Sequence, residues 1–238
     1  VTTQSKTEFF MCGRFNVNDD SFVQLLLEGL EVDNPQEQRH SPFITPCQPV
    51  SVILEEQGQR RLQDATWWLL LEPNDKGFKP SRYTSFNTRY DKVNQAGSAG
   101  YQSYRSQRCI IPASGFGETQ FVNKKAVSYH NMTATDEALA FAGLYRLWRH
   151  PRTGELAYSC SIITNAPHPK FANIHTKASP AMLAPHQYDM WLEPTVNDPN
   201  QLNDVLQPRI VTRLSAQAIN KPSLREAVGE AFVIDRDK

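Results

Sequence analysis

The sequence predicts a single domain of the α+β class, with a mainly antiparallel or mixed, barrel-like β-sheet core and flanking helices. Its 238 residues fit one domain. Short runs rich in β-branched and aromatic residues fill the middle of the chain, whereas apolar residues at helical spacing occur near both ends. The 16 prolines argue against a helical bundle, because proline interrupts the interior of a helix.

Local patterns predict the elements of the first third of the chain. Residues 21–30 have helical apolar spacing after polar N-cap candidates, so we expect a helix there. The N-cap candidates are Asp19, Asp20 and Ser21. Residues 39–49 contain three prolines and predict an ordered loop. Strands are expected at residues 50–55 and 61–71, and residues 65–71 are apolar on both faces, which is typical of a buried strand.

The remaining elements are mostly strands. Residues 72–82 are polar with Pro, Gly and Asn, which predicts a loop. Strands are expected at residues 108–113, 116–121, 127–132, 138–147 and 158–164. The sequence Pro-Arg-Thr-Gly at residues 151–154 indicates a hairpin turn after a strand. Residues 185–192 begin with proline, which suits the first position of a helix.

Composition narrows the classes of function. The 25 basic and 25 acidic residues balance, which disfavours broad duplex binding but leaves room for a local basic groove. No run approaches the ~18 apolar residues of a membrane span. The four cysteines form no C-x-x-C pair, which argues against zinc and favours free thiols in a reducing cytosol. We therefore expect a cytoplasmic monomer with no membrane association, no metal and no cofactor.

The chain begins with a segment unlike the rest. Residues 1–10 (VTTQSKTEFF) are polar and rich in threonine, and they precede Met11. We interpret them as a leader, a misassigned start or a tag-like extension ahead of a domain at residues 11–238. An ordinary N-terminal arm is the alternative interpretation.

Cys12 is the first candidate for chemistry. It stands between Met11 and Gly13, so removal of Met11 would leave a free α-amine beside the thiol. The two groups have pKa values near ~8 and ~8.5, so both are partly nucleophilic at neutral pH. The amine can condense with an aldehyde to an imine, and the thiolate can then close a thiazolidine ring. A small buried cysteine in a first strand is the structural alternative.

Polar residues near predicted strands are further candidates. Glu118 follows an apolar strand, where burial raises a carboxyl pKa and suits general acid–base catalysis. His175 follows the strand at residues 158–164. The ordinary alternatives are a surface glutamate at position 118 and a solvated or structurally hydrogen-bonded histidine at position 175. Asn87 and Arg89 would project from one face of a strand, which suits phosphate and sugar contacts. Arginines and tyrosines interleave around them, as in single-strand nucleic-acid grooves and also on plain surfaces.

Six segments in order resemble one family. The chain contains MCGRF, SFNTRYDKV, RCIIPASGFGE, IITNAP, NIHTKASPAML and, at residues 214–220, LSAQAIN, which are similar to motifs of the SOS response-associated peptidase (SRAP) family, the abasic-site processing proteins. The resemblance runs from Met11 to about residue 220. It implies covalent crosslinking to abasic sites in single-stranded DNA, with AP-lyase, crosslink-reversal and autopeptidase activity. It also implies a bacterial cytoplasmic protein that is associated with the nucleoid during DNA damage.

The resemblance implies roles for single residues. Cys12 would form the thiazolidine with the aldehyde of the abasic deoxyribose. Asn87 would lie against the crosslink. Glu118 would act as acid and base during ring opening and imine formation, and His175 would assist proton transfer and crosslink reversal.

DNA contacts are also implied by the resemblance. Arg14 and Arg89 match residues that contact backbone phosphate. Trp67 and Trp68 match the start of a DNA-contacting Trp-Gly-x-x-Pro segment, but residues 67–71 (WWLLL) lack its glycine and proline. The chain therefore departs from the family pattern in this DNA-contacting segment.

Other departures affect the site itself. Gly117 and Thr119 replace aromatic residues on either side of Glu118, and residues 176–180 (TKASP) replace an Arg-Met-Pro pattern. While residues 1–11 stay attached, Cys12 has an amide nitrogen and cannot form a thiazolidine. Two other functions therefore stay open: a cysteine peptidase or amidohydrolase that uses Cys12 with His175, and a non-catalytic single-stranded DNA-binding module.

Overall fold

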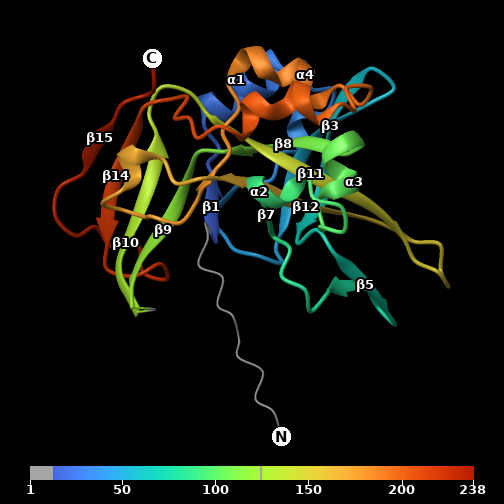
Figure 1. Ribbon diagram of the computed structural model, residues 1–238, viewed down its shortest axis with the longest axis horizontal. Helices are drawn as coiled ribbons and strands as arrows, with labels where there is room; N and C mark the ends of the chain where they lie inside the picture. The colour runs from blue at the N-terminus through green and yellow to red at the C-terminus, as the bar shows by residue number, and fades with distance from the viewer. Residues whose placement is uncertain (1–12, 124) are drawn as a thin grey trace, which may run out of the picture.

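One large sheet of the structure is antiparallel. The computed structural model describes residues 13–123 and 125–238. In this part of the chain, six strands form a sheet in the order β15-β14-β10-β9-β1-β2 (Figure 1). They are β1 (Arg14–Val17), β2 (Ser41–Ile44), β9 (Gly115–Val122), β10 (Lys125–Ala134), β14 (Leu214–Ile219) and β15 (Phe232–Ile234). The order places β1, where the described chain starts, directly beside β9.

The second large sheet closes into a barrel. Within the described residues it follows the order β11-β8-β3-β4-β12, and β12 pairs again with β11. The strands are β3 (Pro49–Glu56), β4 (Gln59–Trp67), β8 (Arg108–Ala113), β11 (Leu139–Arg149) and β12 (Leu156–Asn165). The β4–β12 pair is parallel and the other barrel pairs are antiparallel. The predicted α+β class with a mixed, barrel-like core is confirmed.

Short strands extend the barrel. The strands β7 (Asn87–Arg89) and β13 (Ser179–Pro180) both pair with β12, the first parallel and the second antiparallel. A separate hairpin consists of β5 (Leu71–Asn74) and β6 (Gly77–Pro80). Because β7 pairs with β12, the segment with Asn87 and Arg89 is fixed to the barrel wall.

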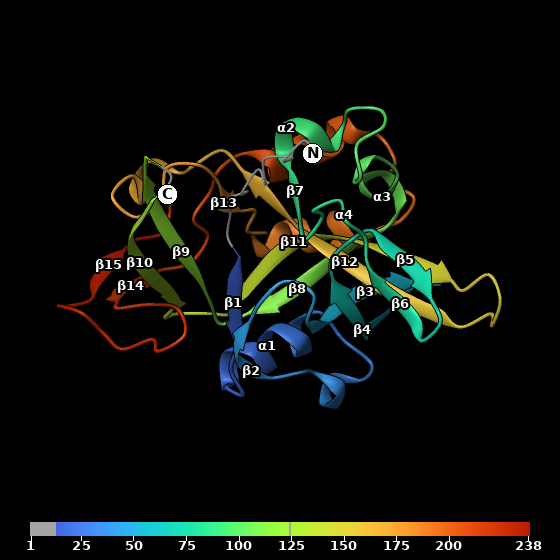
Figure 2. The ribbon, with the colours of Figure 1, turned by 90° about the horizontal axis from the view of Figure 1, so that it is seen from below.

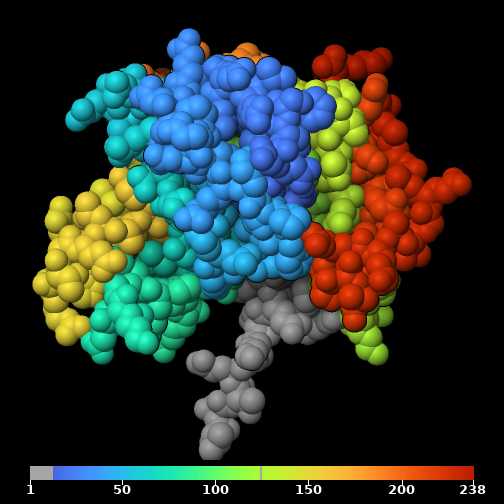
Figure 3. Space-filling model, turned by 180° about the vertical axis from the view of Figure 1, so that it is seen from behind, coloured from blue at the N-terminus to red at the C-terminus, as the bar shows by residue number. Residues whose placement is uncertain are grey.

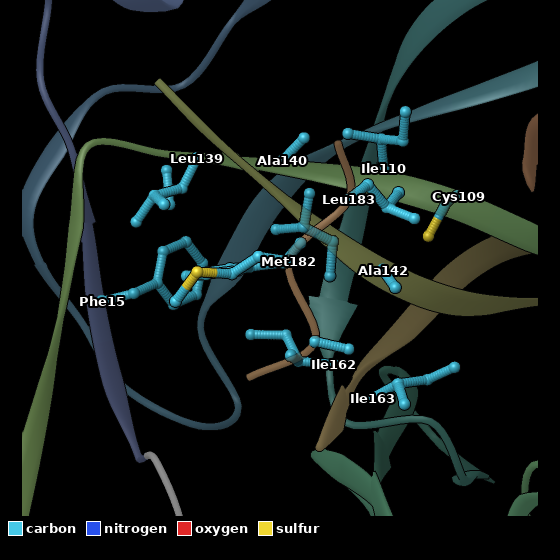
Figure 4. Packing of buried hydrophobic residues seen from close by; sticks show 14 of the residues in the cluster. Phe15, Cys109, Ile110, Leu139, Ala140, Ala142, Ile162, Ile163, Met182 and Leu183 are labelled. Atoms are coloured by element: carbon cyan, nitrogen blue, oxygen red, sulfur yellow. The ribbon is translucent and has the colours of Figure 1, made fainter. Parts of the chain in front are cut away.

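Aromatic side chains join the sheet to the barrel. Phe15 on β1 makes edge contacts with Trp67 at 4.9 Å and with Phe141 at 6.2 Å between ring centroids. Phe116 on β9 contacts Phe141 in the same way at 6.0 Å. Figure 2 shows β1 between the barrel and the sheet of β9, β10 and β14, and Figure 4 shows Phe15 close to Met182 in the core. The two sheets therefore share one core.

Helices pack against strands of the barrel, among them β8 and β12. In α1 (Ser21–Gly29) the Asp20 side chain caps the N-terminus by accepting a hydrogen bond from the backbone N–H of Val23 at 3.0 Å, as the sequence predicted. In α4 (Tyr188–Leu192) the indole N–H of Trp191 donates to the carbonyl of Cys109 at 2.8 Å. The other helices are α2 (Tyr90–Val93), α3 (Tyr101–Ser106), η1 (Pro35–Glu37), η2 (Pro169–Phe171), η3 (Pro185–Gln187) and η4 (Pro199–Leu206). The predicted helix at residues 185–192 corresponds to η3 followed by α4.

Three predicted elements were wrong. The loop expected at residues 39–49 contains β2, which tolerates Pro42 because β2 is an edge strand and the missing N–H breaks no inner ladder. The loop expected at residues 72–82 is the β5–β6 hairpin. The strand expected to reach Leu71 ends at Trp67, since the N–H of Leu69 bonds to the carbonyl of Ser85 instead of to a barrel strand.

No helix in the described residues is long and apolar enough to cross a membrane.

A matched pair of glycines tests the packing of the barrel. A Cβ at Gly143 on β11 would lie 2.7 Å from the sulfur of Cys109, whereas a Cβ at Gly29 in α1 would meet no atom within 4 Å. We expect Gly143→Ala to lower the free energy of unfolding by about 1–3 kcal/mol through overpacking. Gly29→Ala should raise it by up to about 1 kcal/mol, because alanine favours the helix. Urea titrations of both variants measure the two changes, and equal effects would contradict this packing.

Candidate functional site

A pocket of about 230 Å³ lies beside the start of β1 and the second half of β9. Arg14, the first residue of β1, and Gly13 just before it line one part of the pocket. Glu118 and Thr119 line it from β9. His175, from the segment after η2, completes the inner wall. The pocket therefore joins segments that are far apart in the sequence.

Strand register places these segments together. In the β1–β9 pair, Arg14 lies opposite Gly117 and Phe15 lies opposite Phe116. On the other side of β9, Glu118 lies opposite His130 of β10. The pairing with β1 reaches Gly117, so Glu118 lies one residue beyond it and is held by its pairing with β10.

Glu118 and His175 form a buried pair. The Nδ1 atom of His175 lies 3.7 Å from the Oε2 atom of Glu118, and the two side chains are only 4% and 3% exposed. Nδ1 lies closer to the carbonyl oxygen of Thr119, at 3.0 Å. Since a carbonyl only accepts, Nδ1 donates to Thr119, and Nε2 of a neutral ring carries the lone pair.

Burial sets the protonation of His175. Desolvation lowers the pKa of His175, the hydrogen bond to the Thr119 carbonyl opposes this shift, and the charge of Lys177 adds to it. The Nε2 atom is buried and has no hydrogen-bond partner within residues 13–123 and 125–238. The ring is therefore neutral near pH 7, and Nε2 is its unprotonated nitrogen.

Arg14 forms hydrogen bonds to β9 at Glu118 and Thr119 and to β10 at His130. Its Nη2 donates to the carbonyls of Glu118 at 3.0 Å and His130 at 2.9 Å, and Nη1 donates to the hydroxyl of Thr119 at 3.2 Å. The whole residue is 7% exposed. A Cβ at Gly117 would lie 2.0 Å from Nε of Arg14, so the absence of a side chain at Gly117 makes room for the guanidinium.

The other predicted site residues lie around the barrel strands. Asn87 is 9% exposed on β7 and does not occur among the described residues that line the pocket. Arg89 binds both carboxylate oxygens of Asp91, at 2.9 and 2.7 Å, and its side chain is 53% exposed. Trp68 is half-buried and its ring lies 5.8 Å from that of Phe86.

The structure corrects one predicted contact. Trp67 is 0% exposed, and its indole N–H donates to the carbonyl of Phe86 at 2.8 Å. Trp67 therefore presents no surface to DNA, because its large ring packs against Phe15 in the core. The first tryptophan of the pair supports the fold, and Trp68 is the accessible one.

The described cysteines lie elsewhere. Cys109 and Cys160 are buried in the barrel, and burial raises the pKa of both thiols, which keeps them protonated. Cys47 is exposed, and none of these three described cysteines lines the pocket. Cys12, the predicted nucleophile, lies outside the described residues, as do residues 1–11.

Among the described residues, no group of three or more His, Cys, Asp and Glu side chains is arranged to hold a metal ion.

A family model gives the same assignment as the motifs. The model described as "SOS response associated peptidase (SRAP)" matches residues 11–222. The chain belongs to the SRAP family. The match includes every predicted site residue, from Cys12 to His175.

Similar proteins cover most of the chain. The abasic site processing protein YoqW of Bacillus subtilis is 30% identical over 202 residues, which are 83% of this chain and 87% of that protein. The abasic site processing protein YobE of the same organism is 29% identical over 229 residues, which are 91% and 100% of the two chains.

Two solved structures have the same fold. A Bacteroides thetaiotaomicron protein has a TM-score of 0.72 at 19% identity, with 91% of this chain and 95% of that chain covered. A Bordetella bronchiseptica protein has a TM-score of 0.65 at 22% identity, with 88% and 100% covered.

Sequence reasoning missed several pocket residues. Phe43, Thr45, Phe121 and Pro222 also line the pocket, but none of them was singled out. Local sequence gives no signal for them, since β2 was expected to be a loop and Pro222 is distant in the chain. Their shared location depends on pairing between strands that are remote in sequence.

The fit of Arg14 over Gly117 predicts a coupling between two positions. Gly117→Ala should lower the free energy of unfolding by about 1–3 kcal/mol, because the new Cβ meets the guanidinium. In an Arg14→Ala background the same change should be much milder, with a coupling of about 0.5–3 kcal/mol. Urea titrations of the four proteins give this energy. The exposed Arg213 is the matched control, and Arg213→Ala should leave the effect of Gly117→Ala unchanged.

The lowered pKa of His175 predicts a pH dependence of stability. The unfolded chain binds a proton near the ordinary histidine pKa of about 6.5, while folded His175 binds it only at lower pH. The stabilising contribution is thus complete above about pH 6.5 and is lost as the pH falls below it. His175→Gln should make this loss of stability smaller. Urea titrations at pH values above and below about 6.5 measure it. The exposed His186 is the control, and His186→Gln should leave this loss unchanged. Identical slopes of the free energy of unfolding against pH for His175→Gln and the parent would contradict the prediction.

Proposed function

We propose that this protein crosslinks covalently to abasic sites in single-stranded DNA through Cys12, after residues 1–11 have been removed. The observation that carries the proposal is the buried Glu118–His175 pair in a pocket whose wall includes Gly13. Gly13 is the residue to which Cys12 is bonded. Membership of the SRAP family and the printed names of YoqW and YobE support the same function.

The proposed reaction forms two bonds to one carbon. The α-amine of Cys12 attacks the aldehyde carbon of the ring-opened deoxyribose and gives a carbinolamine. Loss of one water gives an imine, and the thiolate then adds to the imine carbon while the nitrogen takes a proton. The net change is the formation of one thiazolidine and one water, with no oxidant or reductant required.

Glu118 and His175 suit the proton transfers of this sequence. Opening the closed sugar requires a base at the hydroxyl and an acid at the ring oxygen, and dehydration requires an acid at the leaving oxygen. The low exposure of both side chains excludes bulk water, which strengthens their interaction with the substrate. We assign Glu118 as the acid and base, His175 as the group that assists through Nε2, and Asn87 as an amide against the crosslink.

For DNA contacts we propose Arg89 and Trp68. The exposed guanidinium of Arg89 suits a phosphate, and the accessible ring of Trp68 suits base stacking. Arg14 is held by the backbone around Glu118, so its contact with a phosphate stays a prediction. AP-lyase, crosslink-reversal and autopeptidase activities are part of the same proposal, since each uses an acid–base pair next to Cys12.

A denaturing gel tests the proposal. Protein that begins at Cys12 is incubated with an abasic oligonucleotide, and we expect a heat-stable shifted band. Cys12→Ala should abolish the band, whereas Cys47→Ser should not change it, because Cys47 lies outside the pocket. Glu118→Gln should slow band formation by about 10²–10⁴-fold, the usual contribution of general acid–base catalysis.

Other outcomes would favour other functions. Protein that retains residues 1–11 should give no band, because its Cys12 nitrogen is an amide. Peptide cleavage without a band would indicate a cysteine peptidase, and DNA retention without a band would indicate a binding module. The absence of a band with folded protein would refute crosslinking.

A further inference from the structure

The C-terminal part of the chain lies against residues 168–175, the η2 turn, which carries His175. Residues 223–238 follow the region that the family model matches, which ends at residue 222. Within them, β15 pairs with β14 at the edge of the antiparallel sheet. Figure 3 shows the red C-terminal segment at the surface, beside the yellow-green part of this sheet. Beyond β15, the side chain of Asp237 contacts the η2 turn.

Asp237 binds two side chains of the η2 turn. Its Oδ2 lies 3.0 Å from Nε2 of His168, and its Oδ1 lies 2.8 Å from Nζ of Lys170. The backbone N–H of Lys170 donates to Nδ1 of His168 at 3.2 Å, so Nδ1 is the accepting nitrogen and Nε2 is the one that donates to Asp237. Nζ of Lys170 also donates to the carbonyls of Asp235 and Arg236, at 2.7 and 3.2 Å. The C-terminal segment therefore holds the start of η2 through several polar contacts.

The segment before β14 fixes Asp237 in turn. The backbone N–H of Ile210 donates to Oδ2 of Asp237 at 2.8 Å, and the N–H of Asp237 donates to the carbonyl of Ile210 at 2.8 Å. Burial by itself raises the pKa of Asp237, but the hydrogen bonds from Ile210 and Lys170 outweigh it, so this pKa lies below its ordinary value. The carboxylate is therefore ionised at neutral pH and is held from two sides.

Hydrogen bonds within the η2 turn connect these contacts to His175. The backbone N–H groups of Ile174 and His175 both donate to the carbonyl of Phe171, each at 2.8 Å. The ring of Phe171 is buried and lies 6.0 Å from that of Phe116 on β9. The core therefore fixes the inner side of the η2 turn, and Asp237 fixes its more exposed side.

We propose that Asp237 is a positioning residue of the site, which holds the η2 turn so that the imidazole of His175 stays beside Glu118. The inference rests on the proposed function, in which His175 assists proton transfer. Asp237 does not occur among the described residues that line the pocket, so it acts through His175 and not on the sugar. A displacement of about 1 Å removes much of the effect of a catalytic group, so a contact that fixes the turn controls the rate.

A double-mutant comparison of crosslinking rates tests this role. Protein that begins at Cys12 is mixed with a saturating abasic oligonucleotide, and the rate of band formation is measured on the denaturing gel. Asp237→Ala should slow the reaction by about 10–100-fold, the effect of misplacing a catalytic group. In a His175→Gln background the same change should have no further effect, because the imidazole that Asp237 positions is absent. Affinity for an oligonucleotide with tetrahydrofuran in place of the abasic sugar should stay unchanged.

Hydrogen exchange of backbone amides tests the positioning without any reaction. In the full chain, Asp237→Ala should speed the exchange of the Ile174 and His175 amides, which bond to Phe171 within the η2 turn. We expect an increase of about tenfold, which corresponds to the loss of one hydrogen bond to a charged group. The amides of the β9–β10 pair should exchange as in the parent. If the C-terminal segment only stabilised the sheet, both sets of amides would exchange faster.

Two further variants complete the test. Asp235→Ala removes an equally charged and more exposed side chain from the same segment, where it pairs with Arg213 at 3.2 Å, and it should change neither the rate nor the exchange. Lys170→Gln removes one contact of Asp237 and keeps the hydrogen bonds of Asp237 with Ile210. It should slow crosslinking and speed exchange in the same way, and it decides the question if Asp237→Ala does not fold.

The outcomes separate this inference from the proposed function. If the parent crosslinks but Asp237→Ala and Lys170→Gln react at the parental rate, the positioning role is wrong and the proposed function stands. Equal slowing in the parent and His175→Gln backgrounds would also overturn it. If the parent gives no crosslink, the proposed function is wrong. Exchange then decides the positioning role by itself: faster exchange confined to the η2 turn supports it, and parental exchange overturns it.

Discussion

The site depends on the register of β1 against β9. This register sets Arg14 opposite Gly117 and so brings Gly13 into the same pocket as Glu118. The core enforces it, because Phe15 on the inner face of β1 packs against Trp67 and Phe141. A shift by one residue would turn Phe15 out of the core, and it would also move Gly13 relative to Glu118.

Burial determines the protonation of His175 beside Glu118. Desolvation holds His175 neutral, so the fold keeps a base that would otherwise titrate near neutral pH. The Thr119 carbonyl fixes the tautomer of His175, and Arg14 donates hydrogen bonds to the carbonyl of Glu118 and the hydroxyl of Thr119. The segment of β9 at Glu118 and Thr119 thus carries one member of the proposed acid–base pair and the carbonyl that orients the other.

Local patterns predicted what local forces determine. The helix capped by Asp20 and the long strands follow from periodicity and caps, and the structure confirms them. The edge strand β2 and the β5–β6 hairpin were missed, because pairing with remote or polar segments stabilises them. Motif resemblance identified Glu118 and His175, but neither the burial of Trp67 nor the fit of Arg14 over Gly117 is visible in sequence spacing.

The central claim is that the amine and the thiol of Cys12 react together, and the mass of the crosslinked peptide tests this most directly. Trypsin releases residues 12–14 from protein that begins at Cys12, and mass spectrometry weighs this peptide with its sugar remnant. A thiazolidine predicts a mass equal to that of the peptide plus that of the sugar remnant, less one water. Borohydride treatment should leave this mass unchanged. An adduct that gains two hydrogens with borohydride, or that maps to a lysine, would contradict the account.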